Sequence, residues 1–261
     1  MYNKIISYII FTKLTKYMSS KSHTDEVFRE KKVLKNPIKF KLQLNEEQKQ
    51  AKEQILNNTL TVLAGSAGSG KTLLACQVAL DGLFRKQYEK VIITRPTVSK
   101  EDIGFLPGDL REKMDPWVQP IYQNMFLLYD KVKIEKFIEE GKIEIVPVSF
   151  MRGRTFVDSM VIVDEAQNVT HEQMEMITTR IGLRSKMVIC GDDHQVDLKS
   201  KRESGFRFLY AAARKVKNMV SITLKQNHRD PIVEELIGIY EDAVERGIMS
   251  GSSGTSGRNK K

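Results

Sequence analysis

The sequence Gly65-Ser66-Ala67-Gly68-Ser69-Gly70-Lys71-Thr72 follows an apolar run that ends at Ala64 and precedes a helical pattern that continues to Phe84. Glycines at this spacing let the backbone curl so that its N–H groups point at a phosphate, and the following helix adds the positive end of its dipole. We expect Lys71 to reach the β- and γ-phosphates of a nucleotide and the Thr72 hydroxyl to bind Mg²⁺. The stretch therefore predicts a nucleoside triphosphate site of the P-loop type.

Short apolar runs alternate with helical patterns on both sides of this loop. The apolar runs cover residues 61–64, 91–94, 142–146, 160–163, 187–190 and 220–224. The helical patterns cover residues 71–84, 120–129, 131–140, 171–181, 204–214 and 231–245, and another helix begins after Asn45 as its N-cap. Such alternation is typical of a parallel sheet with helices on both faces. We expect an α/β fold with a mostly parallel sheet of five principal strands, and an insertion between residues 98 and 150 that prolines punctuate over 103–120.

The positive charge of the chain is concentrated at its two ends. The net charge is +9, of which residues 1–41 contribute +7 and residues 247–261 contribute +3, so residues 42–246 carry −1. We expect a flexible basic arm over 1–41, a folded domain over 42–246 and a disordered Gly/Ser-rich tail over 247–261. The tails favour non-specific attraction to phosphates, and solvated tails that bind nothing are an equal alternative.

Cysteine usage and hydropathy indicate a cytoplasmic protein. Cys76 and Cys190 both fall in predicted core elements, which is typical of buried free thiols in a reducing compartment. The apolar run over residues 5–11 is interrupted by Ser7 and Tyr8 and is too short to span a bilayer. We therefore expect no association with a membrane.

A pair of adjacent carboxylates follows the apolar run 160–163. Asp164 and Glu165 would lie at the end of a buried strand, where Mg²⁺ and a water molecule meet the γ-phosphate. We expect Asp164 to bind Mg²⁺, directly or through water, and Glu165 to orient and deprotonate the attacking water. The adjacent glutamate favours hydrolysis over phosphoryl transfer to a small acceptor.

A third polar stretch, Gly191-Asp192-Asp193-His194-Gln195, follows the apolar run 187–190. Its position predicts that Gln195 contacts the γ-phosphate or the catalytic water and reports nucleotide state to a neighbouring surface. The alternative is an ordinary polar residue of a loop.

In this order the three stretches resemble the superfamily 1 helicase core, and they are more similar to the PhoH-like ATPase family. The resemblance covers about residues 42–246 and implies a RecA-like P-loop NTPase fold. Its signatures are Thr94-Arg95-Pro96, Gly104-Phe105-Leu106-Pro107-Gly108-Asp109-Leu110, Met151-Arg152-Gly153-Arg154-Thr155-Phe156, Asp164-Glu165-Ala166-Gln167-Asn168, Thr179-Arg180-Ile181-Gly182 and Asp197-Leu198.

The resemblance implies further roles. Gln48 matches the glutamine that reads adenine, which implies ATP in preference to GTP. Arg229 resembles the arginine that contacts the γ-phosphate, although Leu224-Lys225-Gln226-Asn227-His228-Arg229 departs from the Val-Arg-His run common in the family. The segment 95–98 corresponds to a strand-binding loop, so Arg95 is a candidate for nucleic-acid contact, with an ordinary solvated or ion-paired arginine as the alternative. Three further arginines have two possible roles: Arg152, Arg154 and Arg180. They are expected either to contact the phosphates of a single strand or to act as an arginine finger that reaches the nucleotide of a neighbouring subunit.

Together these features predict Mg²⁺-dependent ATP hydrolysis. One RecA-like core cannot close on a second core in the same chain, so motor action would require a homo-oligomer, and similarity to ring-forming ATPases favours a hexamer. Two functions remain open: an ATPase that acts on RNA or single-stranded DNA, and a slow ATPase that switches a protein partner without a nucleic-acid substrate.

Overall fold

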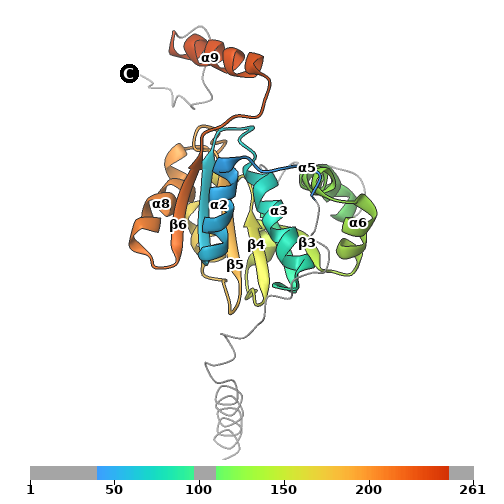
Figure 1. Ribbon diagram of the computed structural model, residues 1–261. Coiled ribbons are helices and arrows are strands. Elements are labelled where there is room, and N and C mark those ends of the chain that lie inside the picture. The colour runs from blue at the N-terminus through green and yellow to red at the C-terminus, as the bar shows by residue number, and fades with distance from the viewer. Residues whose placement is uncertain (1–39, 97–109, 247–261) are drawn as a thin grey trace, which may run out of the picture. The chain divides into compact units, whose positions relative to one another are not determined.

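The computed structural model describes residues 40–96 and 110–246 (Figure 1). Most of the predicted N-terminal arm, the segment 97–109 and the C-terminal tail lie outside these residues. These residues belong to one compact unit.

A six-stranded sheet forms the centre of this unit, with strand order β3-β2-β4-β5-β1-β6. Every strand pair in it is parallel. The strands are β1 Leu60–Gly65, β2 Lys90–Arg95, β3 Ile143–Pro147, β4 Ser159–Val163, β5 Lys186–Gly191 and β6 Met219–Leu224. The α/β prediction is confirmed, with six strands in place of the five principal strands expected, because both edge strands pair along nearly their whole length.

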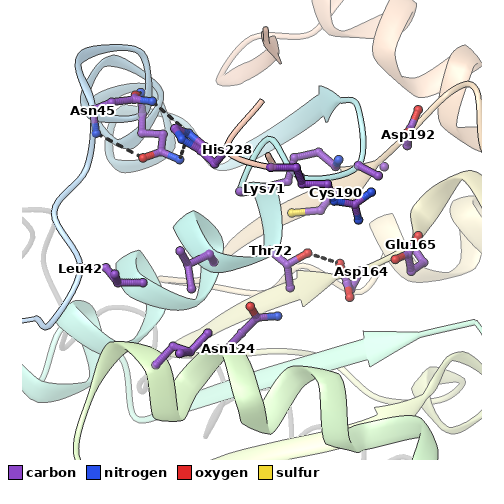
Figure 2. Close-up of a pocket in the computed structure, with 18 of the residues that line it drawn as sticks. Leu42, Asn45, Lys71, Thr72, Asn124, Asp164, Glu165, Cys190, Asp192 and His228 are labelled. Atoms are coloured by element: carbon purple, nitrogen blue, oxygen red, sulfur yellow. Dashed lines mark hydrogen bonds between the residues drawn. The ribbon is translucent and has the colours of Figure 1, made fainter. Parts of the chain in front are cut away.

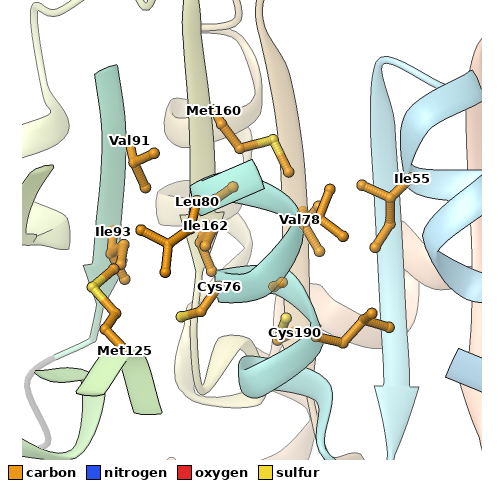
Figure 3. Packing of buried hydrophobic residues seen from close by; sticks show 14 of the residues in the cluster. Ile55, Cys76, Val78, Leu80, Val91, Ile93, Met125, Met160, Ile162 and Cys190 are labelled. Atoms are coloured by element: carbon orange, nitrogen blue, oxygen red, sulfur yellow. The ribbon is translucent and has the colours of Figure 1, made fainter. Parts of the chain in front are cut away.

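Alternating side chains bury both faces of the sheet. On β4, Met160 and Ile162 belong to one hydrophobic cluster, whereas Val161 and Val163 belong to the other. Fully burying an aliphatic side chain of this size contributes about 1.5–3 kcal/mol, so the two layers supply much of the driving force for folding. The first layer, seen partly in Figure 3, contains α2 Glu46–Asn57, α3 Lys71–Phe84, α5 Leu110–Leu128 and α6 Lys131–Glu139. The second contains α7 His171–Thr178 and α8 Gly205–Ala212.

The remaining elements are short, apart from the last helix. The 3₁₀ turns are η1 Val148–Met151, η2 Ala166–Asn168, η3 Lys201–Glu203 and η4 Ala213–Lys215, and the last helix is α9 Pro231–Glu245. The helix expected over 204–214 is therefore divided into α8 and η4.

The predicted helix at 120–129 is longer than expected. Helix α5 begins at Leu110 and continues through Pro116 and Pro120, where the sequence suggested interruptions. Proline removes a helix hydrogen bond. Here tertiary packing outweighs that cost, because Ile121 and Met125 are fully buried against the first layer.

The two cysteines are free and buried, as expected. Burial raises the pKa of both thiols, and the negative charge of Asp164 adds to the effect. Figure 3 shows Cys76 on α3 and Cys190 on β5, both within the first layer. Among the described residues, none of the helices is both long and apolar enough to cross a membrane.

Candidate nucleotide-binding site

The parallel strands bring the predicted site residues to one edge of the sheet. Because β5 lies between β1 and β4, the loop after β1 and the carboxylates after β4 face each other across the end of β5. A cavity of about 610 Å³ opens at this edge (Figure 2). The predicted residues that line it are Gln48, Ala67, Gly68, Gly70, Lys71, Thr72, Asp164, Glu165, Gln195 and Arg229. Two other loop residues, Gly65 and Ser66, line a second cavity of about 520 Å³, and Ser69 is buried.

Two glycines of the loop have left-handed backbone conformations. The φ angles of Gly68 and Gly70 are +90° and +81°. A Cβ on Gly68 would lie 2.5 Å from the side-chain oxygen of Asn227, and a Cβ on Gly70 would lie 2.7 Å from Nε2 of Gln48. Both positions therefore require glycine for backbone conformation and for close packing.

Lys71 is folded back onto its own loop. Its Nζ donates to the carbonyl oxygens of Gly65, at 2.7 Å, and Ser66, at 2.8 Å. These two bonds hold the ammonium group at the mouth of the loop. A bound phosphate would have to replace one or both carbonyls as its partner.

Thr72 and Asp164 meet beneath the loop. The Thr72 hydroxyl donates to Oδ1 of Asp164 at 2.6 Å, and Figure 2 shows this bond directly. The pKa of Asp164 is raised, mainly because the carboxyl group is buried, and the negative charge of Glu165 raises it further. The hydrogen bond from Thr72 and the positive charge of Arg95 lower it in part. A hydroxyl and a buried carboxylate at this distance are hard oxygen ligands suited to Mg²⁺, whose charge would offset the burial of the carboxylate.

Glu165 is held in an uncommon conformation. Its φ of +50° is left-handed, which is rare outside glycine and recurs at functional sites. Oε2 accepts a hydrogen bond of 2.7 Å from Nε2 of Gln167, and Oε1 lies 3.4 Å from Nη2 of Arg95. Glu165 lines the cavity, and both of its carboxylate oxygens accept a contact from a neighbouring side chain.

Gln167 connects the carboxylate to the next strand and was missed by the sequence analysis. Its side-chain oxygen accepts a 3.0 Å hydrogen bond from the backbone N–H of Asp192, while its amide nitrogen donates to Glu165. The side chain is only 1% exposed. The sequence analysis included Gln167 in the signature that begins at Asp164 but gave it no role, because its partners depend on the tertiary fold.

Gln195 and Arg229 reach the same cavity from two further loops. The backbone N–H of Gln195 donates to the carbonyl of Asp192 at 3.2 Å. The backbone N–H of Arg229 donates to the side chain of Asn227 at 3.0 Å. Both side chains are exposed, so they are free to meet a ligand.

Gln48 is buried rather than solvated. It completes a capping box with Asn45 at the start of α2, as the N-cap prediction requires. Its Nε2 lies 3.4 Å from Nε2 of His228, which also lies 3.1 Å from Nδ2 of Asn45. These contacts, drawn in Figure 2, occupy the carboxamide that is predicted to read adenine. His228 also lines the cavity, and the sequence analysis gave it no role.

None of the four candidate arginines is among the described residues that line the cavity. Arg95 contacts Glu165, as described above. Arg154 forms a 2.6 Å ion pair with Glu144 and lies over the ring of Phe156. Burial would raise the pKa of Glu144, but hydrogen bonds and charges from Lys90 and Arg154 lower it overall. Arg180, which follows α7, donates to the backbone carbonyl of Met176 in that helix, and Arg152 is exposed.

Comparisons with known proteins agree on one family. Residues 42–241 match the family described as PhoH-like protein. A PhoH-like protein of Synechocystis sp. is 39% identical over 74% of this chain and 60% of its own length. One from Bacillus subtilis is 42% identical over 70% of this chain and 59% of its own length. The chain thus spans about 60% of the length of the curated relatives it matches.

A solved structure, the large terminase of a thermophilic bacteriophage, is similar at 10% identity and a TM-score of 0.49, over 75% of this chain and 50% of that chain. A likeness at this level carries no argument about function. The family match covers most of the described fold, including the loop, the carboxylates and Gln195. The chain therefore belongs to the PhoH-like protein family.

Proposed function

We propose that this chain binds ATP with Mg²⁺ and hydrolyses it, acting on RNA or single-stranded DNA as a homo-oligomer. The observation that carries the proposal is the 2.6 Å contact between Thr72 and Asp164 beside Glu165, in a cavity that Lys71 also lines. A phosphate-binding loop, an Mg²⁺ ligand pair and a carboxylate base are the parts that hydrolysis of a nucleoside triphosphate requires.

We propose a separate role in ATP hydrolysis for each residue of the site. Lys71 leaves its loop carbonyls and binds the β- and γ-phosphates, while Thr72 and Asp164 would hold Mg²⁺. When bound, Mg²⁺ would neutralise charge that develops on the phosphate oxygens. Glu165 orients the attacking water and accepts its proton on a carboxylate oxygen. Gln195 and Arg229 contact the γ-phosphate, where a guanidinium stabilises transition-state charge.

The preference for ATP is proposed to depend on Gln48. Its carboxamide offers both a donor and an acceptor, the pair needed to bond the amino group and N7 of adenine. To do so it must exchange its contacts with Asn45 and His228 for the base. We therefore propose that the contacts between Gln48, Asn45 and His228 break when the nucleotide binds.

The nucleic-acid substrate is tested by the rate of ATP turnover. We expect oligouridylate RNA to raise ATP turnover by about 5-fold, which corresponds to about 1 kcal/mol in the activation free energy. The stimulation should fade steeply from about 50 mM to about 200 mM salt, because phosphate contacts release counterions. Absence of stimulation at low salt by either RNA or single-stranded DNA would contradict this part of the proposal.

The homo-oligomer is supported by the exposed apolar face of α9. Ile232, Leu236, Ile239 and Tyr240 recur at helical spacing and have exposed fractions of 46–64%. This helix begins two residues after Arg229, so a second copy packed on its first turn would lie near that residue of the proposed nucleotide site. A protein partner of another kind on this face is the second candidate function, a nucleotide-gated interaction switch with slow ATPase activity.

Light scattering after gel filtration, at micromolar concentration with ATP and Mg²⁺, tests the oligomer. The wild-type chain is expected to elute as an oligomer, and Leu236→Glu is expected to shift it to the monomer by placing a charge in an apolar contact. Val132→Glu is the matched control, because Val132 is exposed on α6. A monomeric wild-type chain would favour the switch over the oligomer.

A further inference from the structure

We propose that Arg95 is a releasable clamp on Glu165: it holds the carboxylate in the absence of nucleic acid, and a phosphate of a bound single strand takes over the guanidinium and frees Glu165. This inference rests on the proposed function, because it assumes that Glu165 is the base and that a nucleic-acid strand is the substrate. It assigns the regulation of that reaction to one ion pair.

The placement of the two side chains follows from the strand register. Thr94 of β2 pairs with Val163 of β4, and the backbone N–H of Asp164 donates to the carbonyl of Thr94 at 2.8 Å. Arg95 and Glu165 therefore leave neighbouring strands at the same edge of the sheet. The guanidinium Nη2 of Arg95 lies 3.4 Å from Oε1 of Glu165.

The two oxygens of Glu165 are held with unequal strength. Oε2 accepts a 2.7 Å bond from the buried Gln167, whereas the contact of Oε1 with Arg95 lies at the long end of hydrogen-bond distances. The side chains of Arg95 and Glu165 are 23% and 38% exposed, so solvent reaches the pair. Gln167 thus fixes the position of the carboxylate, and Arg95 provides a contact that a competitor can replace.

A phosphate diester is a competitor of suitable chemistry. A guanidinium forms two parallel hydrogen bonds with phosphate oxygens, compared with its single long contact to Glu165. Among the described residues, Arg95 is not part of the cavity lining, and its side chain is partly exposed. The exchange breaks no covalent bond and leaves Glu165 oriented by Gln167.

The clamp also changes what Glu165 can do. A carboxylate that accepts from both Gln167 and Arg95 has fewer lone pairs directed at a water molecule. Removing Arg95 leaves Oε1 open toward the cavity that Glu165 lines. ATP turnover without nucleic acid should then be faster, and nucleic acid should no longer stimulate it.

Arg95→Gln tests the clamp through ATP turnover with and without oligouridylate. We expect its turnover without RNA to rise about 5-fold over wild type, and its stimulation by RNA to fall to about 1-fold. Arg85→Gln is the matched control, because Arg85 forms a partly exposed 2.8 Å ion pair with Asp81 at the far end of α3. Its turnover and stimulation should equal those of wild type. An Arg95→Gln chain whose unstimulated turnover stays level or falls, or whose stimulation is unchanged, overturns the clamp.

A binding cycle tests the same clamp without relying on catalysis. Coupling is reciprocal, so if RNA releases Glu165 from Arg95, neutralising Glu165 must strengthen RNA binding. Glu165→Gln is expected to bind fluorescein-labelled oligouridylate about 5-fold more tightly than wild type in the absence of nucleotide. In the Arg95→Gln background the same substitution should leave affinity unchanged. Equal affinities in the wild-type and Glu165→Gln chains overturn the clamp.

The two assays separate failure of the clamp from failure of the proposed function. A wild-type chain that hydrolyses no ATP contradicts the proposed function, while the binding cycle still decides the clamp. A wild-type chain that is stimulated by RNA, beside an Arg95→Gln chain that behaves like Arg85→Gln, contradicts the clamp alone. A wild-type chain that binds no oligouridylate contradicts both.

Discussion

The Glu165→Gln chain is expected to hydrolyse ATP about 10²–10⁴ times more slowly than wild type, which is the usual contribution of a positioned general base. The amide cannot accept the proton of the attacking water. Its oxygen can still accept the hydrogen bond from Gln167 that holds the side chain in place. Nucleotide affinity should therefore persist while turnover is lost.

Single-turnover phosphate release and binding of a fluorescent ATP analogue measure these two quantities separately. Glu175→Gln, which neutralises an exposed carboxylate on α7, is the matched control and should keep wild-type turnover. Undiminished turnover in Glu165→Gln would show that the base is another group.

The Lys71→Ala chain is expected to lose ATP affinity by about 10- to 150-fold, the worth of a hydrogen bond to a charged group. The ammonium group lies against the loop, where it now bonds the carbonyls of Gly65 and Ser66. Its loss removes the charge that faces the phosphates. The carbonyl groups of Gly65 and Ser66 would then bond to water, which changes the free energy of unfolding little because the loop is partly exposed.

Thermal unfolding separates these effects. A ligand that binds only the folded state raises its stability, so ATP with Mg²⁺ should raise the midpoint of wild type. In Lys71→Ala this rise should be clearly smaller at the same ATP concentration, because the ligand contribution falls with affinity, and the midpoint without nucleotide should change little. Lys49→Ala removes an exposed lysine of α2 and should keep the full rise. An equal rise in Lys71→Ala would contradict its assignment to the phosphates.

Local spacing explains why much of the site was predictable. The loop after β1 needs left-handed backbone conformations at Gly68 and Gly70, and glycine is the residue that favours them, so the residue type alone predicts this part of the loop. The carboxylates Asp164 and Glu165 follow a continuous apolar strand. Parallel strands then bring the loop and the carboxylates to one edge without any further information.

Contacts between distant segments explain what was not predictable. Gln167 and His228 gain their partners only when separate loops converge, and nothing in their immediate sequence marks them as buried or engaged. Arg95 was expected either at a nucleic-acid strand or as a solvated or ion-paired arginine, but the identity of its partner, Glu165, depends on the register of β2 against β4. Helix α5 continues through Pro116 because packing on the first layer outweighs local propensity.

The measurement that tests ATP hydrolysis at this cavity most directly is phosphate release from ATP by the purified wild-type chain, with Mg²⁺ and then with excess EDTA. We predict steady phosphate release that EDTA abolishes and that exceeds release by Glu165→Gln by about 10²-fold or more. Phosphate release at the level of Glu165→Gln, or unaffected by EDTA, would contradict the account.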